Sequence, residues 1–544
     1  MLTKLEKTTL RSQLFRHLDG IVTCPTAFVL FDKGVTQHLL NQENVELSEL
    51  TSLFKANEGY LNVALRTLCS QGWLIQHVNN KNNTVTYQCN EQSQYAFKYF
   101  HLYKKAFELL KFSENFNSRK FESESFYQLE KLYNDFSNSF NVSKPKLQIE
   151  QDILAQISMH IEGIIVGPTI VLLGMSGMFH KYFMQTKFKA EEFHKDSESF
   201  GRLLDILTRL GWFTKTNDSY EFTDKGLFFA RRASAYGVTV SYIPTLRKLD
   251  KLIFGNSAFF RTEGIGNEEI HVDREMNVWG SGGAHAAYFR IIDEIVIDLF
   301  NRPIHDQPKG ILDVGCGNGA FLKHLFNVIE TRTARGKQLE EFPLLLIGVD
   351  YNEAALQITR RNLVQADIWA KVIWGDIGNP KALSEDLQEK YSINLSDLLN
   401  VRTFLDHNRI WQDPKPVKKI INTASTGAYA YIGKRLNNNL VIESLKQHFN
   451  KWKPYIDKFG LLLIELHTSN PALVANNLGK TAATAYDATH GYSDQYIIEL
   501  EEYMIAMNAI GLIPETHTSR KFPNSELATV SINLFKPKQK KPCK

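Results

Sequence analysis

Two short segments in the second half of the chain carry dense sets of polar side chains that could do chemistry. The first follows the apolar run LLNV and contains Asp406, His407 and Arg409. The second, YDATHGYSDQY, ends a predicted long loop that leads into a helix expected to start at Tyr496, and it contains His490 and Gln495. A histidine near its ordinary pKa can remove a proton from an oxygen or carbon nucleophile. A histidine, a carboxylate and a third oxygen donor can equally form a facial metal site. The residue types leave both interpretations open, together with a hydrogen-bonded network without a catalytic role.

A glycine-rich turn and two acidic residues indicate a nucleoside site. The segment KGILDVGCGNGAFLKHLF has the pattern of an apolar strand, a turn and an amphipathic helix, and its glycines allow the backbone to pass close to a ligand. Two further predicted strands, LLLIGVD and KVIWGD, end in Asp350 and Asp376. Because parallel strands present their carboxyl ends at one edge of an open sheet, we expect Asp350 to accept ribose hydroxyls and Asp376 an adenine amino group.

The part of the chain before the glycine-rich turn contains the same sequence pattern twice. HLDGIVTCPT from His17 returns as HIEGIIVGPT from His160, and the segment from Ser48 to Gln76 is echoed by the segment from Ala190 to Lys215. Each copy combines an amphipathic helix that ends at Gly-Trp with two β-forming stretches separated by an Asn- or Asp-rich tip. This pattern predicts two winged-helix-like units.

The motif DVGCGNG, with the acids of GVD and WGD, resembles the class I S-adenosylmethionine-dependent methyltransferases. A dinucleotide enzyme, the competing interpretation, expects GxGxxG instead. The resemblance implies S-adenosyl-L-methionine as the cofactor. In that fold the segment before the first strand touches the methionine end, where Arg274 is expected to pair with the carboxylate. The implied cofactor-binding residues are Arg274, Gly282, Asp313, Gly315, Gly317, Gly319, Asp350, Asp376 and Ile377.

The combination of VDREMNVWGSGGAH, VRTFLDHNR and THGYSDQY, behind the two front units, resembles the metal-dependent methyltransferases of polyketide starter modules of the apratoxin type. The resemblance covers about His271 to Leu534. It implies methyl transfer to the central carbon of a malonyl group that a carrier protein holds as a thioester. No serine stands in a setting typical of phosphopantetheine attachment, so we expect a carrier in trans, or a small free acid as the substrate.

The same resemblance implies a mononuclear iron or manganese site. Its ligands would be Asp406, His490 and Gln495, with His407 and Asp487 competing for the place of Asp406. The implied catalytic residues are His407, Asp406 and His490. We therefore predict an α/β fold: a Rossmann-like class I methyltransferase domain at 266–544, after a mostly helical region that comprises a first winged-helix-like unit with its connector (1–145) and a second with a helical lid (146–265).

The net charge, the cysteines and the apolar runs indicate which partners and which compartment to expect. A net charge of +4 over 544 residues is small, and between Val45 and Gly72 the cations Lys55 and Arg66 are outnumbered by glutamates, so we expect no nucleic acid. Five cysteines without CxxC spacing indicate a reducing cytoplasm. The N-terminus has no signal-peptide pattern, and the apolar run from Ile164, broken by Gly167 and Pro168, is too short to predict a membrane span.

Two other functions stay open. A small-molecule O-methyltransferase would use the helical front region to form a homodimer and a histidine to deprotonate a hydroxyl group. A winged-helix DNA-binding regulator would instead sense S-adenosylmethionine as a ligand. The acidic balance of the front helices disfavours the regulator.

Overall fold

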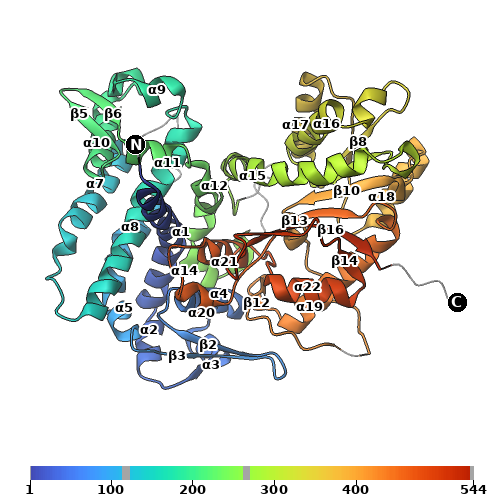
Figure 1. Cartoon of the computed structure of the whole chain (residues 1–544). Helices are drawn as coiled ribbons and strands as arrows, with labels where there is room; N and C mark the ends of the chain where they lie inside the picture. Colours follow the sequence, from blue (N-terminus) through green and yellow to red (C-terminus); the bar gives the residue numbers. More distant parts are fainter. Residues whose placement is uncertain (1, 113–122, 261–269, 419, 539–544) are drawn as a thin grey trace. The chain divides into compact units, whose positions relative to one another are not determined.

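Both copies of the winged-helix-like unit form in the computed structural model, which describes residues 2–112, 123–260, 270–418 and 420–538 (Figure 1). The first copy consists of α3 (Leu47–Phe54), α4 (Glu58–Ser70), β1 (Val45–Glu46), β2 (Ile75–Asn79) and β3 (Thr84–Gln88). The second consists of α10 (Ser197–Arg209), β4 (Phe188–Lys189), β5 (Phe213–Thr216) and β6 (Ser219–Phe222). The sheet orders β1-β3-β2 and β4-β6-β5 are equivalent, which confirms that the sequence repeat is a structural repeat.

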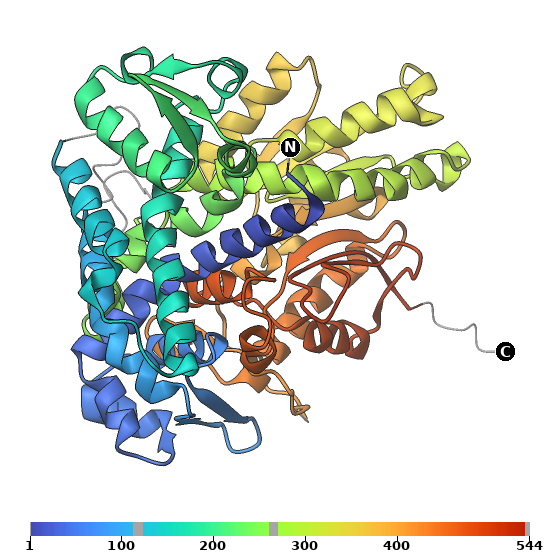
Figure 2. The same ribbon diagram turned by 60° about the vertical axis from the view of Figure 1, so that its left-hand side comes forward.

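The repeated decapeptides lie in two long helices, α1 (Lys4–Asp32) and α8 (Gln148–Met175), which pack against each other (Figure 2). A Cβ atom on Gly20 of α1 would stand 2.3 Å from the Cα of His160. A Cβ atom on Gly163 of α8 would stand 2.4 Å from the carbonyl oxygen of His17. Corresponding residues of the two copies therefore meet at one helix crossing that only glycine permits.

These two helices are long and apolar enough to cross a membrane by length and composition alone. Their most apolar windows are 78% and 83% buried inside the protein, as in core helices. The expectation that Gly167 and Pro168 break the apolar run was wrong, because α8 continues through Pro168 over 28 residues. The apolar side chains buried on both sides of the proline outweigh its one missing hydrogen bond.

The chain separates into two compact units, each described by itself. The front unit comprises Met1–Ala284, Ala428–Leu436 and Asn470–Asp494. Its remaining elements are α2 (Val35–Leu40), α5 (Ser93–Tyr99), α6 (Lys104–Lys111), α7 (Ser123–Ser137), α9 (Lys181–Gln185), α11 (Asp224–Ala230), α12 (Ser234–Ser241), α13 (Ile243–Leu246), α14 (Leu249–Phe254), β11 (Ala430–Tyr431), β12 (Lys434–Arg435), α20 (Pro471–Ala475) and α21 (Ala483–Gly491). The unit is therefore completed by two segments from the second half of the chain.

The predicted domain limits remain predictions. The limit between 265 and 266 lies in residues 261–269, outside the described residues. The connector predicted between Phe112 and Pro145 contains α7 where it is described, and Glu130 of α7 forms an ion pair with Arg202 of α10. That stretch therefore contributes a packed helix to the front unit.

The sheet unit comprises His285–Gly427, Asn437–Ser469 and Gln495–Lys544. Its mixed sheet has the order β14-β16-β13-β10-β7-β8-β9, and β15 pairs with β16. The strands β7 to β10 and β13 are parallel, whereas β16 runs antiparallel to β13. The strands are β7 (Gly310–Val314), β8 (Leu345–Asp350), β9 (Lys371–Trp374), β10 (Leu398–Thr403), β13 (Leu461–Leu466), β14 (Leu512–Pro514), β15 (Arg520–Phe522) and β16 (Val530–Pro537). This sheet confirms the prediction of a Rossmann-like α/β domain.

Helices cover both faces of the sheet. Its helices are α16 (Ala320–Arg332), α17 (Glu353–Gln365), α18 (Pro380–Tyr391), α19 (Asn438–Trp452) and α22 (Leu500–Ala509), and α15 (Arg274–Phe300) begins in the front unit and continues here. Figure 1 shows α16 and α17 on one face and α19 and α22 on the other. The chain runs from β7 to β8 and β9 in one direction, then returns to β10 on the other side of β7. The order therefore switches at β7, where open sheets of this kind bind ligands at the carboxyl edge.

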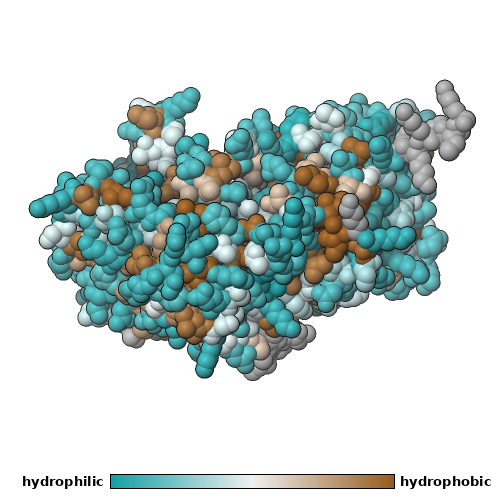
Figure 3. Space-filling view, turned by 90° about the horizontal axis from the view of Figure 1, so that it is seen from below, coloured by the Kyte–Doolittle hydropathy of each residue, from teal (hydrophilic) through white to brown (hydrophobic). Residues whose placement is uncertain are grey.

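Apolar side chains form the core of the sheet unit. They include Leu312, Val314, Ile347, Val349, Leu387 and Leu398. The face seen in Figure 3 is mostly hydrophilic, with apolar residues in separate areas.

The arginines on the two helices that would read DNA, α4 and α10, have partners within the front unit. Every residue of α4 from Gly59 to Ser70 is buried. Its cation Arg66 forms an ion pair with Asp487 of α21. On α10, Arg202 pairs with Glu130 and the Arg209 guanidinium lies over the ring of Tyr133. These arginines are therefore occupied by protein partners.

Candidate active site

The glycine-rich turn between β7 and α16 has a left-handed backbone. Gly315, Gly317 and Gly319 have φ values of +81°, +56° and +77°, a region that side-chain-bearing residues rarely adopt. The N–H of Gly317 donates to Oδ2 of Asp350 at 3.0 Å, and nothing lies within 4 Å of the position that a Cβ on Gly317 would take. The turn therefore presents open backbone beside an acidic strand end.

Asp350 and Asp376 both stand at the carboxyl edge of the sheet. Asp350 ends β8, and Asp376 follows β9, the strand that pairs with β8. Oδ1 of Asp376 accepts the N–H of Gly378 at 2.7 Å. Ile377 packs against the core of the sheet unit, and its carbonyl accepts Nε1–H of Trp452 at 2.8 Å. The structure therefore brings these predicted residues to one edge.

Two aromatic rings beside these acids were missed by sequence reasoning. The ring centroids of Tyr351 and Trp374 are 5.4 Å apart, and Trp374 Nε1–H donates to the Tyr351 carbonyl at 3.0 Å. Their side chains are 60% and 54% exposed. Exposed aromatic ring faces at the carboxyl edge of such a sheet can stack on a purine. The available signal was an aromatic residue directly after the acid of GVD and another within WGD.

Asp313 lies on β7 and is buried. Burial raises the pKa of its carboxyl group to about 8, and the negative charge of Asp350 adds to the effect. Its Oδ1 has no hydrogen-bond partner. The carboxyl group of Asp313 is therefore largely protonated at neutral pH.

We expect this protonation to make stability depend on pH. Burial also raises the pKa of Asp19 in the front unit to about 8, whereas an unfolded aspartate titrates at about 3.9. Between these values the folded state binds protons that the unfolded state has lost, so the free energy of unfolding falls as pH rises from about 4 to about 8. Thermal unfolding at pH 5 and pH 8 measures this slope. Asp313→Asn should flatten it, and Asp19→Asn is the matched variant in the other unit; an unaltered slope in both would contradict the raised pKa values.

His407 is held by an acid of the neighbouring strand. It lies in a 3-10 helix (Asp406–Asn408) after β10, is 5% exposed, and its Nδ1–H donates to Oε1 of Glu465 on β13 at 2.6 Å. This bond leaves Nε2 as the nitrogen that can accept a proton. Sequence reasoning missed Glu465, although an acid inside the apolar run LLLIEL was the available signal.

Asp406 is the centre of a buried charge network. Its Oδ1 accepts Nη1–H of Arg402 and Nε2–H of His448, each at 2.7 Å. Burial opposes the charge on Asp406, but Arg402 and His448 outweigh burial and hold its pKa below the usual value. His448, on the buried face of α19, was also missed. Asp406 therefore carries a negative charge at the carboxyl end of β10.

His490 and Gln495 come from different units. The long loop predicted around them is wrong in part, because residues 471–475 and 483–491 form α20 and α21, and the helix expected at Tyr496 begins at Leu500. In α21, Nδ1–H of His490 donates to the carbonyl of Tyr486 at 2.7 Å, so Nε2 is the nitrogen that can bind a proton or a metal ion. His490 belongs to the front unit, and Gln495 and Asp406 to the sheet unit. Their grouping stays a prediction.

The described residues fit the predicted metal ion only in part. No group of three or more His, Cys, Asp or Glu side chains that could hold a metal ion occurs in residues 2–112, 123–260, 270–418 and 420–538. However, Oδ2 of Asp406 and Oε2 of Glu465 are buried without a hydrogen-bond partner. Buried carboxylate oxygens without donors are suited to accept a cation.

Arg274 and Gly282 lie on α15, within the front unit. The segment before the first strand is therefore helical from Arg274 onward. Gly282 is exposed. The strand-end residues belong to the sheet unit, so the contact of Arg274 and Gly282 with the cofactor remains a prediction.

Three protein-family models match successive parts of the chain. Residues 10–76 match the AprA N-terminal domain, residues 162–256 the AprA winged helix domain, and residues 269–533 the AprA MT2-like domain. The second winged-helix-like unit lies within the winged helix match. The first overlaps the N-terminal domain match.

Individual relatives are more distant. The trans-aconitate 2-methyltransferases of Acidovorax sp. (strain JS42) and Acidovorax ebreus (strain TPSY) are each 37% identical over 89 residues, 15% of this chain and 30% of those proteins. The chain thus spans 30% of the length of these curated relatives. The CurJ carbon methyltransferase structure is 11% identical, with 77% and 99% coverage and a TM-score of 0.33. An O-methyltransferase structure from Nostoc punctiforme PCC 73102 is 12% identical, with 67% and 94% coverage and a TM-score of 0.39. These values are too low to carry a conclusion about this chain.

Proposed function

Because the chain belongs to the S-adenosylmethionine-dependent methyltransferases with the AprA N-terminal, winged helix and MT2-like domains, we propose that it methylates a carbon atom of a malonyl-type acyl thioester in polyketide-like biosynthesis. The acyl group would be presented by a carrier protein in trans. The observation that carries this proposal is the hydrogen bond between His407 and Glu465 at the carboxyl edge of the sheet.

In the proposed reaction the cofactor is held by the strand ends. Asp350 accepts hydrogen bonds from the ribose, Asp376 binds the adenine amino group, and the glycine turn admits the methionine portion. The exposed rings of Tyr351 and Trp374 support this placement because they offer an apolar face to the purine.

His407 is the proposed general base. Its Nε2 takes a proton from the carbon between the two carbonyl groups, and the electron pair of that C–H bond remains on carbon. This carbon attacks the sulfonium methyl group, the S–CH3 bond breaks, and S-adenosylhomocysteine leaves. Glu465 stabilises the imidazolium that forms and keeps the ring oriented.

The proposal retains the iron or manganese ion with Asp406, His490 and Gln495 as its ligands. When bound, such an ion supplies Lewis-acid polarisation of the acyl oxygens. The buried Oδ2 of Asp406, which has no hydrogen-bond partner, supports a role in holding a cation.

The test is intact-mass analysis of a malonyl-loaded carrier protein after incubation with the protein and S-adenosylmethionine, with and without ferrous or manganous ion. We expect the mass of one methyl group to be added to the acyl arm, and fragmentation to place it on carbon. A methyl group found only on hydroxyl acceptors would replace the proposal with the O-methyltransferase alternative. If the chelator-treated protein forms the same amount of product with and without added metal, the reaction does not need the ion.

A further inference from the structure

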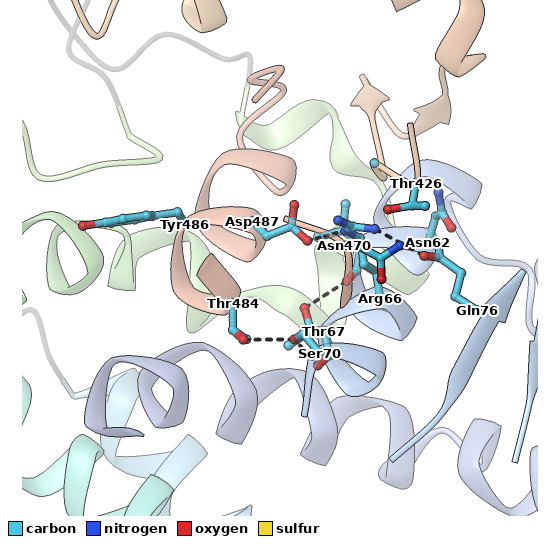
Figure 4. Close-up of polar contacts among 12 residues, drawn as sticks. Asn62, Arg66, Thr67, Ser70, Gln76, Thr426, Asn470, Thr484, Tyr486 and Asp487 are labelled. Atoms are coloured by element: carbon cyan, nitrogen blue, oxygen red, sulfur yellow. Dashed lines mark hydrogen bonds and ion pairs between the residues drawn. The ribbon is translucent and has the colours of Figure 1, made fainter. Parts of the chain in front are cut away.

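The helix that carries His490 is anchored to the first winged-helix-like unit by a buried ion pair. Nε–H of Arg66 on α4 donates to Oδ2 of Asp487 on α21 (Figure 4). The side chain of Arg66 is 0% exposed and that of Asp487 16%. Nη1–H of the same guanidinium donates to Gln76 of β2 at 3.3 Å. Arg66 therefore connects α21 to the β-hairpin of the first winged-helix-like unit.

Other contacts hold both ends of α21 within the front unit. At its start, the hydroxyl of Thr484 is 3.1 Å from Ser70 Oγ on α4. Just after its end, the hydroxyls of Tyr492 and Thr26 are 3.0 Å apart. Next to His490, a Cβ on Gly491 would stand 2.8 Å from a methyl group of Val63, so α21 lies very close to α4 there. These contacts place α21 along α4.

We propose that Arg66 is a positioning residue that sets the orientation of His490 through Asp487. Asp487 and His490 are three residues apart in one helix, so their side chains project from the same side of α21. Holding the Asp487 carboxylate at Arg66 therefore fixes the rotation of α21 about its axis, and with it the direction of His490. This inference rests on the proposed function, which gives His490 a role in the reaction.

The burial of the Arg66–Asp487 pair supports a role in positioning α21 rather than in stabilising the fold. Removing two charges from water costs free energy that their attraction does not always recover, and apolar replacements of similar size are often as stable. The planar guanidinium can bind the carboxylate and the Gln76 amide in two fixed directions, which an ammonium group cannot reproduce. The sequence thus places the residue with the most directional donors where α21 meets the duplicated region.

The first measurements compare Arg66→Met, Arg66→Lys and Asp487→Asn in the full chain. We expect Arg66→Met to lower kcat by about 100-fold, the size of effect that a displacement of about 1 Å can produce, with an unchanged KM for S-adenosylmethionine. Hydrogen exchange in residues 483–491 should become faster. The kcat of Arg66→Lys should lie between those of the wild type and Arg66→Met. The control is Arg202→Met on α10, the corresponding helix of the second copy, whose ion pair with Glu130 is far more exposed; it should leave kcat and exchange in α21 unchanged.

A variant cycle with His490→Ala separates the possible outcomes. If Arg66 acts through His490, Arg66→Met should have no further effect on kcat in the His490→Ala background. Wild-type kcat in His490→Ala would refute the role of His490 in the proposed function. An inactive His490→Ala beside a fully active Arg66→Met or Asp487→Asn would overturn only the inference about Arg66. Lower thermal stability with wild-type kcat in the folded fraction would also overturn it, because that result describes a structural ion pair.

Discussion

Replacing His407 by alanine is expected to lower the rate of methyl transfer by about 10² to 10⁴-fold, the usual contribution of a general base. The reason is geometric, because Glu465 fixes the ring at 2.6 Å and leaves Nε2 to take the proton. Glu465→Gln should also lower the rate, since the amide can accept the Nδ1–H bond but does not stabilise the imidazolium. Single-turnover product formation followed by mass spectrometry measures both effects.

Cofactor binding is the internal control for these two variants. Calorimetric titration with S-adenosylhomocysteine should give wild-type affinity, because neither side chain is assigned to the nucleoside. A matched control is His324→Gln, which changes a partly exposed histidine of the same unit whose Nε2 contacts Asp293 at 2.6 Å. Wild-type turnover in His407→Ala would refute the general-base assignment.

Replacing Asp350 by alanine is expected to weaken cofactor binding roughly 100-fold or more. A hydrogen bond to a charged group contributes about 1.5 to 3 kcal/mol, so the loss of two bonds to the ribose costs at least about 3 kcal/mol. The variant also removes the acceptor of the Gly317 N–H, so the glycine turn loses its anchor. Calorimetry with S-adenosylhomocysteine measures the change in Kd.

The matched control for Asp350 is Glu353→Gln, which neutralises an exposed acid three residues later that pairs with Arg360. Its affinity should equal that of the wild type. Asp350→Asn should lie between the two, because the amide keeps one acceptor but loses the charge. Wild-type affinity in Asp350→Ala would contradict the placement of the ribose at β8.

The Rossmann-like sheet and the duplicated front units could be predicted because their signals are local. Apolar strands that end in glycine or aspartate, and helices that end at Gly-Trp, are set by the period of the side chains and by backbone conformation over a few residues. Gly72 and Gly211, for example, both have φ of +82° at the helix ends predicted for them. The loop expected around His490 was wrong because residues 483–491 form a helix that packs on α4, a surface that is remote in sequence.

The sequence by itself determined which residues stand at the carboxyl ends of β7, β8, β9 and β10, because strand ends follow from the local pattern of apolar residues and parallel strands share one carboxyl edge. Only the tertiary structure decided the partners of those residues. His407 meets Glu465 across 58 residues, and Arg66 meets Asp487 across 421. Such pairs depend on which surfaces are buried against each other, and burial also decides which acids keep their protons. A linear pattern contains the residues of a site, whereas long-range packing sets their charge and orientation.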